Sequence, residues 1–82
     1  MNIFNEILTE DSFSLIDGKK IAAKVEFEKT DNYINITKTM VDPSYQGKGL
    51  AKILMNKCQE IATSEKLAIK ATCSYAIKFF NL

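Results

Sequence analysis

The sequence predicts an α+β fold in which helices pack against a mixed, mostly antiparallel sheet. Residues 20–28 alternate between apolar and polar side chains, which is typical of a half-buried strand. Residues 50–64 carry apolar side chains at helical spacing instead. Between these two patterns, residues 41–51 hold two of the three glycines and the only proline. They predict a tight connection from a strand into a helix N-terminus.

Length and charge limit the classes of protein that this chain can represent. Its 82 residues suffice for a single domain, residues 1–82. The net charge of +1 supplies no basic field for nucleic acid, so no nucleic-acid partner is expected. All eleven basic residues are lysine, which excludes bidentate guanidinium recognition.

The residue types that the chain lacks exclude several chemistries. Without histidine, the commonest general base and the commonest zinc ligand are missing. Cys58 and Cys73 do not have the spacing of a zinc site, so no metal is expected. No apolar run approaches the ~20 residues of a membrane span, and no charged-then-apolar leader opens the chain. These features predict a reduced, soluble, cytoplasmic protein without a membrane partner.

The first part of the chain predicts antiparallel hairpins. Residues 1–10 fit a short helix or an irregular lead-in, through Ile3, Phe4, Ile7 and Leu8, and both interpretations stay open. Residues 12–16 predict a strand, and Asp17-Gly18 predicts a hairpin turn. The next strand, residues 20–28, places one set of side chains on its buried face: Ile21, Ala23, Val25 and Phe27.

A third strand is predicted over residues 33–41, after a polar turn. Its alternation puts Ile34, Ile36 and Met40 on one face, and Asn35, Thr37 and Thr39 on the other. A helix follows, with a single apolar stripe of Leu50, Ile53, Leu54, Cys58, Ile61 and Ala62.

The final segments are predicted to complete the sheet. Residues 66–72 alternate as a strand, and the helix before them makes it parallel to residues 33–41 through a right-handed crossover. Residues 74–80 predict a short helix that Ser74 or Thr72 caps.

The connection over residues 41–51 is the candidate binding site. A glycine-rich turn at a helix N-terminus presents backbone N–H groups that the helix dipole polarises, which favours an anion such as phosphate. Gly47 and Gly49 permit positive φ angles and close approach of a ligand. The alternative interpretation is an ordinary turn before a helix.

The segment Gln46-Gly47-Lys48-Gly49-Leu50-Ala51 resembles the Q/R-x-x-G-x-G/A motif of the GCN5-related N-acetyltransferases. Asp42-Pro43 and Tyr45 before the motif agree with this family, as does Cys73-Ser74-Tyr75-Ala76 followed by Phe79. The chain is similar to the small, YjdJ-type branch of the superfamily. The resemblance extends over residues 12–80.

This resemblance implies that acetyl-CoA, and hence coenzyme A, is the cofactor. Its pantetheine arm is then expected between two splayed parallel strands, beside the backbone of Met40 and Val41. Its pyrophosphate is expected on the N–H groups of Gln46, Gly47, Lys48, Gly49, Leu50 and Ala51. The Lys48 side chain either adds charge toward the phosphates or faces solvent.

Tyr75 and Cys73 are the candidate catalytic residues. Tyr75 follows the second splayed strand, where a phenol can protonate the leaving thiolate, or it simply packs as an aromatic ring. Cys73 stands at a helix start that can lower its pKa, so it either accepts an acetyl group or lines the pocket. Glu26 and Glu28 are possible bases, although alternation puts both on the solvated face. Cys58 belongs to the core.

Two classes of function follow, with a third that is weaker. The first is an acetyl-CoA-dependent N-acetyltransferase acting on an amine, such as a protein or peptide lysine or a terminal amine, through an acceptor site that the short chain leaves open. The second is a non-catalytic CoA- or acyl-CoA-binding module, which the lack of a carboxylate on residues 33–41 favours. An RNA-binding or protein-interaction domain is the third, and the near-neutral charge disfavours it.

Overall fold

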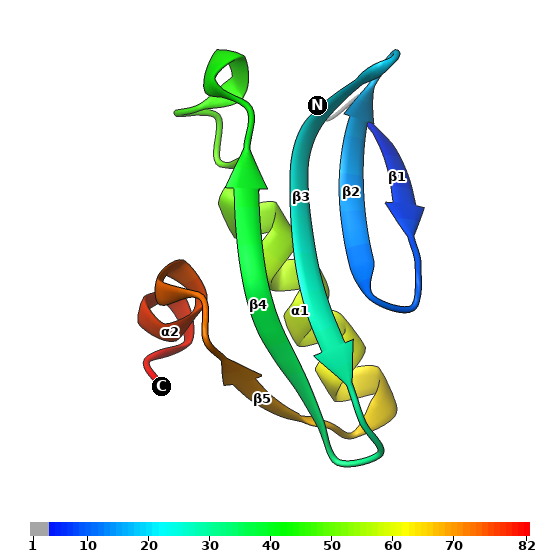
Figure 1. Ribbon diagram of the computed structural model, residues 1–82, viewed down its shortest axis with the longest axis vertical. Coiled ribbons are helices and arrows are strands. Elements are labelled where there is room, and N and C mark those ends of the chain that lie inside the picture. The colour runs from blue at the N-terminus through cyan, green and yellow to red at the C-terminus, as the bar shows by residue number, and fades with distance from the viewer. Residues whose placement is uncertain (1–3) are drawn as a thin grey trace.

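The computed structural model describes residues 4–82 as one five-stranded sheet with helices (Figure 1). The strands follow one another across the sheet in chain order, all antiparallel except for β5, which runs parallel to β4. The elements are β1 (Asn5–Leu8), β2 (Ser12–Asp17), β3 (Lys20–Lys29), β4 (Tyr33–Val41), the 3-10 turn η1 (Pro43–Tyr45), α1 (Leu50–Glu65), β5 (Ala68–Ala71) and α2 (Ser74–Phe80). This architecture confirms the predicted α+β class.

The N-terminal segment, for which a short helix and an irregular lead-in were both possible, contains a strand instead. Asn5–Leu8 pairs with β2 as the edge strand β1, from Asn5 opposite Ile16 to Leu8 opposite Phe13. Ile3 lies outside the described residues. Within residues 4–82, no helix is long and apolar enough to cross a membrane.

Helix α1 covers one face of the sheet (Figure 1). Its buried residues are Leu50, Leu54, Met55, Cys58, Ile61 and Ala62. The predicted stripe differs at two positions, because Ile53 is only partly buried and Met55, which was not predicted, is fully buried. The helix ends where Lys66 adopts a left-handed conformation with φ 57° and its N–H bonds back to Ala62 and Thr63. This cap occupies the first residues of the strand predicted over 66–72, so β5 is limited to Ala68–Ala71.

A β-bulge in β4 overturns the predicted faces of its second half. Phe27 pairs with Ile36 and Glu26 with Lys38, which leaves Thr37 as an extra residue. Before the bulge the prediction holds, because Ile34 and Ile36 are fully buried. After it the alternation reverses: Thr39 shares the α1 face, and Met40 turns to the opposite face with 43% of its surface exposed.

A second irregularity corrects the predicted face of β3. Leu15 pairs with Ala23 and Ile16 with Ile21, so Ala22 is the extra residue of a bulge. Ala22 is therefore buried, and Ile21, predicted on the buried face, is 46% exposed. Ala23, Val25 and Phe27 face the core as expected.

The parallel strands β4 and β5 separate after a short pairing. Their ladder runs from Tyr33 opposite Ala68 to Ile36 opposite Ala71. The N–H groups of Thr72 and Cys73 then both donate to the Ile36 carbonyl, at 3.0 and 3.2 Å, and the chain turns into α2. Within residues 4–82, no strand pairs with residues 37–41 of β4 on the edge that faces away from β3. The predicted splay is confirmed, and it begins at the bulge.

Candidate functional site

The loop between η1 and α1 has the backbone conformation that its glycines permit. Gly47 and Gly49 have φ angles of +81° and +76°, which other L-residues adopt only with strain. Gly49 is the N-cap of α1. A Cβ atom built on either glycine meets nothing within 4 Å. The space directly above both glycines is therefore open to a ligand.

Several backbone N–H groups at the start of α1 have no hydrogen-bond acceptor within residues 4–82. The first amide bonded within α1 is that of Ile53, which donates to the Gly49 carbonyl at 3.3 Å. The amides of Leu50, Ala51 and Lys52 therefore lie in the first helical turn without an intrahelical acceptor. The Gln46 amide differs, because it already donates to the Pro43 carbonyl at 3.4 Å. An anion would thus meet the amides after Gln46.

A cavity of about 290 Å³ joins this loop to the end of β4 and to the start of α2. It brings together seven of the residues singled out from the sequence: Val41, Gln46, Gly47, Gly49, Leu50, Ala51 and Tyr75. Lys48 is exposed and does not line the cavity, which agrees with the solvent-facing interpretation of its side chain. Met40 does not line it either, because the bulge turns its side chain to the other face.

Two residues that line the cavity were not assigned to it from the sequence. Tyr45 was noted only as a flank of the motif, and Lys52 lies outside the predicted apolar stripe of the helix. The position of Lys52 in the first turn of α1 is the available signal, because side chains there lean back toward the helix N-terminus. Its side chain adds one positive charge to the residues that line the cavity.

Cys73 lies outside the cavity lining but has a specific contact. Its Sγ–H donates to Thr39 Oγ1 at 3.4 Å, across the gap where β4 and β5 separate. Partial burial raises the pKa of the Cys73 thiol, but hydrogen bonds that the rotatable Thr39 hydroxyl and the backbone N–H groups of Ala76 and Tyr75 can donate to the thiolate lower it by more. The net pKa is below the ordinary value, which favours the thiolate. In contrast, burial raises the pKa of Cys58 to about 12, so this core thiol stays neutral.

The residue at the cap of α2 differs from the prediction. Cys73 itself is the N-cap, and no side-chain hydrogen bond caps the helix. Thr72 lies before the cap and Ser74 is the first helical residue, so neither plays the predicted role. The chain turns at Cys73 because its N–H is held by Ile36, which is a tertiary contact.

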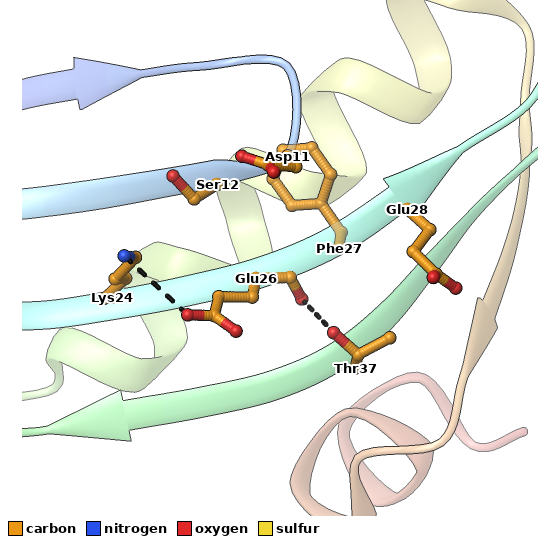
Figure 2. A pocket seen from close by; sticks show the side chains of 7 residues that line it. All are labelled: Asp11, Ser12, Lys24, Glu26, Phe27, Glu28 and Thr37. Atoms are coloured by element: carbon orange, nitrogen blue, oxygen red, sulfur yellow. Dashed lines mark hydrogen bonds and ion pairs between the residues drawn. The ribbon is translucent and has the colours of Figure 1, made fainter.

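The two candidate carboxylate bases lie at a different cavity. Glu26 and Glu28 line a hollow of about 310 Å³ on the face of the sheet opposite α1 (Figure 2). Glu26 pairs with Lys24 at 3.7 Å, and the amide of Asn35 donates to Glu28 at 3.5 Å. This hollow shares no lining residue with the loop cavity. The structure thus favours the solvated interpretation of both carboxylates.

These features define a class: a mixed sheet with one splayed parallel pair, and a glycine loop that leads from the splay into a helix N-terminus. The profile of the GCN5-related N-acetyl-transferase family matches residues 12–82. The chain belongs to this family. No curated protein matches the sequence.

Solved structures of similar fold include enzymes with different acceptors. One is a ribosomal-protein-alanine N-acetyltransferase from Brucella melitensis biovar Abortus 2308, with a TM-score of 0.67 and 14% identity over 76% of this chain and 48% of that chain. Another is an aminoglycoside acetyltransferase from an uncultured soil metagenomic sample, with a TM-score of 0.67 and 18% identity over 85% of this chain and 53% of that one. The present chain spans about half the length of these two proteins.

A GCN5-like protein from Staphylococcus aureus is similar over nearly the whole chain. The two share 26% identity over 99% of this chain and 81% of that chain, with a TM-score of 0.59. This likeness and the family match agree on the fold, and they cover both the glycine loop and the Cys73–Tyr75 segment.

Proposed function

We propose that this protein is an acetyl-CoA-dependent N-acetyltransferase that acts on an amine. The observation that carries the proposal is the single cavity in which Gly47 and Gly49, the end of the splayed strand β4 and the Tyr75 ring meet. A phosphate loop alone would suit many anions. The splay beside it adds a free strand edge, which suits an extended, amide-containing arm such as pantetheine.

The loop residues fit a pyrophosphate. A Cβ at Gly47 or Gly49 would fill the open space over the loop, and the amides of Leu50, Ala51 and Lys52 lack intrahelical acceptors. Val41 at the end of β4 lines the same cavity, and the backbone of Met40 and Val41 lies on the free edge. These residues would hold the coenzyme, whose thioester supplies the acetyl group.

Tyr75 and Cys73 are the proposed catalytic residues. Tyr75 lines the loop cavity with 40% of its surface exposed, so its hydroxyl can hold a proton for the departing thiolate. Cys73 stands at the splay, where the Thr39 hydroxyl and two backbone N–H groups favour a thiolate. Its proposed role is to line the acetyl site or to accept the acetyl group.

The acceptor is proposed as a primary amine such as a protein lysine or a terminal amine. Support comes from the fold relatives, whose names specify a ribosomal-protein alanine and an aminoglycoside as acceptors of those enzymes. A cytoplasmic location, where acetyl-CoA and reduced thiols occur together, is part of the same proposal.

A non-catalytic CoA-binding module is the second candidate. It is favoured by one observation: Glu26 and Glu28 line a hollow that is separate from the loop cavity, and among residues 4–82 no carboxylate lines the loop cavity. A binding module needs the loop and the splay but no base.

Titration of isotopically labelled protein with acetyl-CoA tests the coenzyme site. We expect the amide resonances of Gly47 to Lys52 to shift on binding, and unchanged resonances at millimolar acetyl-CoA would overturn both candidates. Radiolabelled acetyl transfer to a panel of amines and peptides then separates them. Transfer supports the enzyme, whereas binding without transfer to any acceptor supports the module.

A further inference from the structure

Tyr45 lies at the junction between the loop cavity and the β2–β3 hairpin. It is the last residue of η1, directly before the glycine loop, and its ring lines the cavity. Its hydroxyl donates a hydrogen bond to Asp17 Oδ2, at the turn of the hairpin 28 residues earlier. The turn and η1 lie at the same end of the sheet (Figure 1).

Further contacts surround the same ring. Phe4 packs edge-on against Tyr45 with 5.8 Å between ring centroids. The ammonium nitrogen of Lys20 lies 5.7 Å from the Tyr45 centroid, within the range of a cation–π interaction. The ring is thus held by one residue before β1 and by two residues at the hairpin turn.

The other end of η1 is tied to the same hairpin. The Asp42 N–H donates to the Ala22 carbonyl at 2.9 Å, and Asp42 Oδ1 lies 3.5 Å from Lys20 Nζ. Asp42 Oδ1 also accepts from the Ser44 N–H at 2.9 Å. Asp42 and Tyr45 therefore tie both ends of η1 to the β2–β3 hairpin, and Lys20 contacts both.

The glycine loop itself has little else to hold it. Within residues 4–82, no backbone hydrogen bond is donated by Gly47 or Lys48. The loop is therefore positioned by its two ends, which are the start of α1 and Tyr45. A loop fixed in its binding conformation loses less conformational entropy when a ligand binds.

The charges of the contacts are consistent with an anion nearby. Asp17 and Asp42 would repel a pyrophosphate, but Asp17 accepts the Tyr45 hydroxyl and Asp42 is paired with Lys20 and the Ser44 N–H. The hydrogen bond to Asp17 and partial desolvation raise the pKa of Tyr45, so the phenol remains a donor at neutral pH. Each acidic side chain in the cluster thus has its own donor.

We infer that Tyr45 is a positioning residue for the coenzyme loop, and that Asp17 and Lys20 of the β2–β3 hairpin set the affinity for the anionic coenzyme through it. The inference rests on the proposed acetyl-CoA site. It assigns a role in coenzyme binding to residues of a hairpin that does not itself line the loop cavity.

The test compares Tyr45→Phe with the control Tyr33→Phe. The Tyr33 hydroxyl makes no hydrogen bond with any of the described residues, whereas the Tyr45 hydroxyl bonds to Asp17. For Tyr45→Phe we expect acetyl-CoA affinity to fall about threefold to tenfold, the range for one hydrogen bond. The ¹⁵N heteronuclear NOE of Gly47 and Lys48 should also fall in the ligand-free protein. Tyr33→Phe should leave both unchanged.

Asp17 variants provide the rescue experiment. Asp17→Ala should reproduce the loss seen for Tyr45→Phe, and Asp17→Asn should recover most of it, because its amide oxygen still accepts the hydroxyl. The double variant Tyr45→Phe, Asp17→Ala should bind no more weakly than either single one. Melting temperatures verify that every variant is folded.

The outcomes separate this inference from the proposed function. Wild-type affinity and wild-type loop order in Tyr45→Phe would overturn the positioning role. Equal losses in Tyr45→Phe and Tyr33→Phe would overturn it as well. If wild-type protein does not bind acetyl-CoA, the proposed function fails, and the heteronuclear NOE of the loop still decides whether Tyr45 orders it.

Discussion

The two halves of β4 differ in what their backbone and side chains do. In the first half, Tyr33 to Ile36, the strand has neighbours on both edges, and Ile34 and Ile36 are fully buried beneath α1. In the second half, residues 37–41, the edge toward β5 is free within the described chain, and Met40 is 43% exposed. The boundary between them is the β-bulge at Thr37, the first residue of the second half.

This difference shows how one strand can stabilise the fold and still offer the free backbone edge that the proposed coenzyme site needs. A fully paired strand has no backbone groups left for a coenzyme. An unpaired one contributes less to the core and exposes an edge that other chains can join. In β4 the pairing with β5 stops after four residues, next to the bulge in the β3–β4 ladder, and the loop cavity lies at the far end of the strand.

The largest effect is expected in the paired half. Ile34→Ala should lower the free energy of unfolding by about 2–5 kcal/mol, because it opens a cavity in a fully packed site. Met40→Ala in the other half should change it by about 0.5 kcal/mol or less. Denaturant unfolding followed by circular dichroism measures both. Equal losses would mean that the two halves contribute alike to the core.

The second prediction concerns the glycine loop, which follows the unpaired half of β4. Gly49→Val should reduce acetyl-CoA affinity by more than about tenfold, because a side chain enters the space above the loop and the residue must keep a φ of +76° at a cost of about 1–2 kcal/mol. Isothermal titration measures the affinity. Glu60→Ala, on the exposed face of α1, is the control and should bind normally. Loss in both variants would indicate unfolding instead of a binding site.

The third prediction uses the cysteines, one in the core and one at the splay. Because the pKa of Cys73 is lowered, its alkylation by iodoacetamide should have a midpoint below pH 9, and Thr39→Val should move this midpoint upward. Cys58 should react only in unfolded protein. Mass spectrometry of peptides from a pH series follows each thiol. An unchanged midpoint in Thr39→Val would show that the Thr39 hydroxyl does not lower the pKa of Cys73.

The same two pKa shifts predict opposite effects of pH on stability. Cys73 has a folded pKa below its unfolded value, so its contribution is present at high pH and is lost as pH falls through the folded value. Cys58 has a folded pKa of about 12, above its ordinary 9.0, so its contribution is complete below pH 9 and is lost as pH rises toward 12. Unfolding curves of Cys58→Ala and wild type should therefore converge above pH 9. Parallel pH profiles would contradict this assignment.

The smallest effect is expected for an ion pair near the start of β4, at the end of the sheet where β4 is paired on both edges. Lys29 Nζ lies 3.1 Å from Glu65 Oε2, and it links the end of β3 to the last residue of α1. Both side chains are partly exposed, so Glu65→Gln should cost about 0.5 kcal/mol or less, and the difference should vanish at about 1 M salt. A larger, salt-independent loss would show that the pair is part of the packing.

In β3 and β4, the bounds of a strand and the faces of its side chains could be predicted from the sequence to different extents. The strand was predicted over residues 33–41 with both of its ends as observed. The faces of its second half were predicted wrongly, because alternation assumes one residue per position and cannot detect the inserted Thr37. The same limitation explains Ala22 and Ile21 in β3.

The site was predicted in its local part only. Gly47, Gly49 and the helix N-terminus follow from neighbouring residues, and they lie together in the structure. The contact of Tyr45 with Asp17 was not predicted, because Asp17 comes 28 residues earlier. The predicted caps of α2 were wrong for a similar reason, since Ile36 holds the turn at Cys73.

The sequence by itself determined the order of the strands and helices after β1, the glycine loop and the family. Each depends on periodicity or on turn chemistry within a few residues. Only the tertiary structure decided where β4 leaves β5, which side chains face α1, and which groups contact Cys73 and Tyr45. Those features depend on strand register and on contacts between distant segments, which are selected by the packing of the whole sheet.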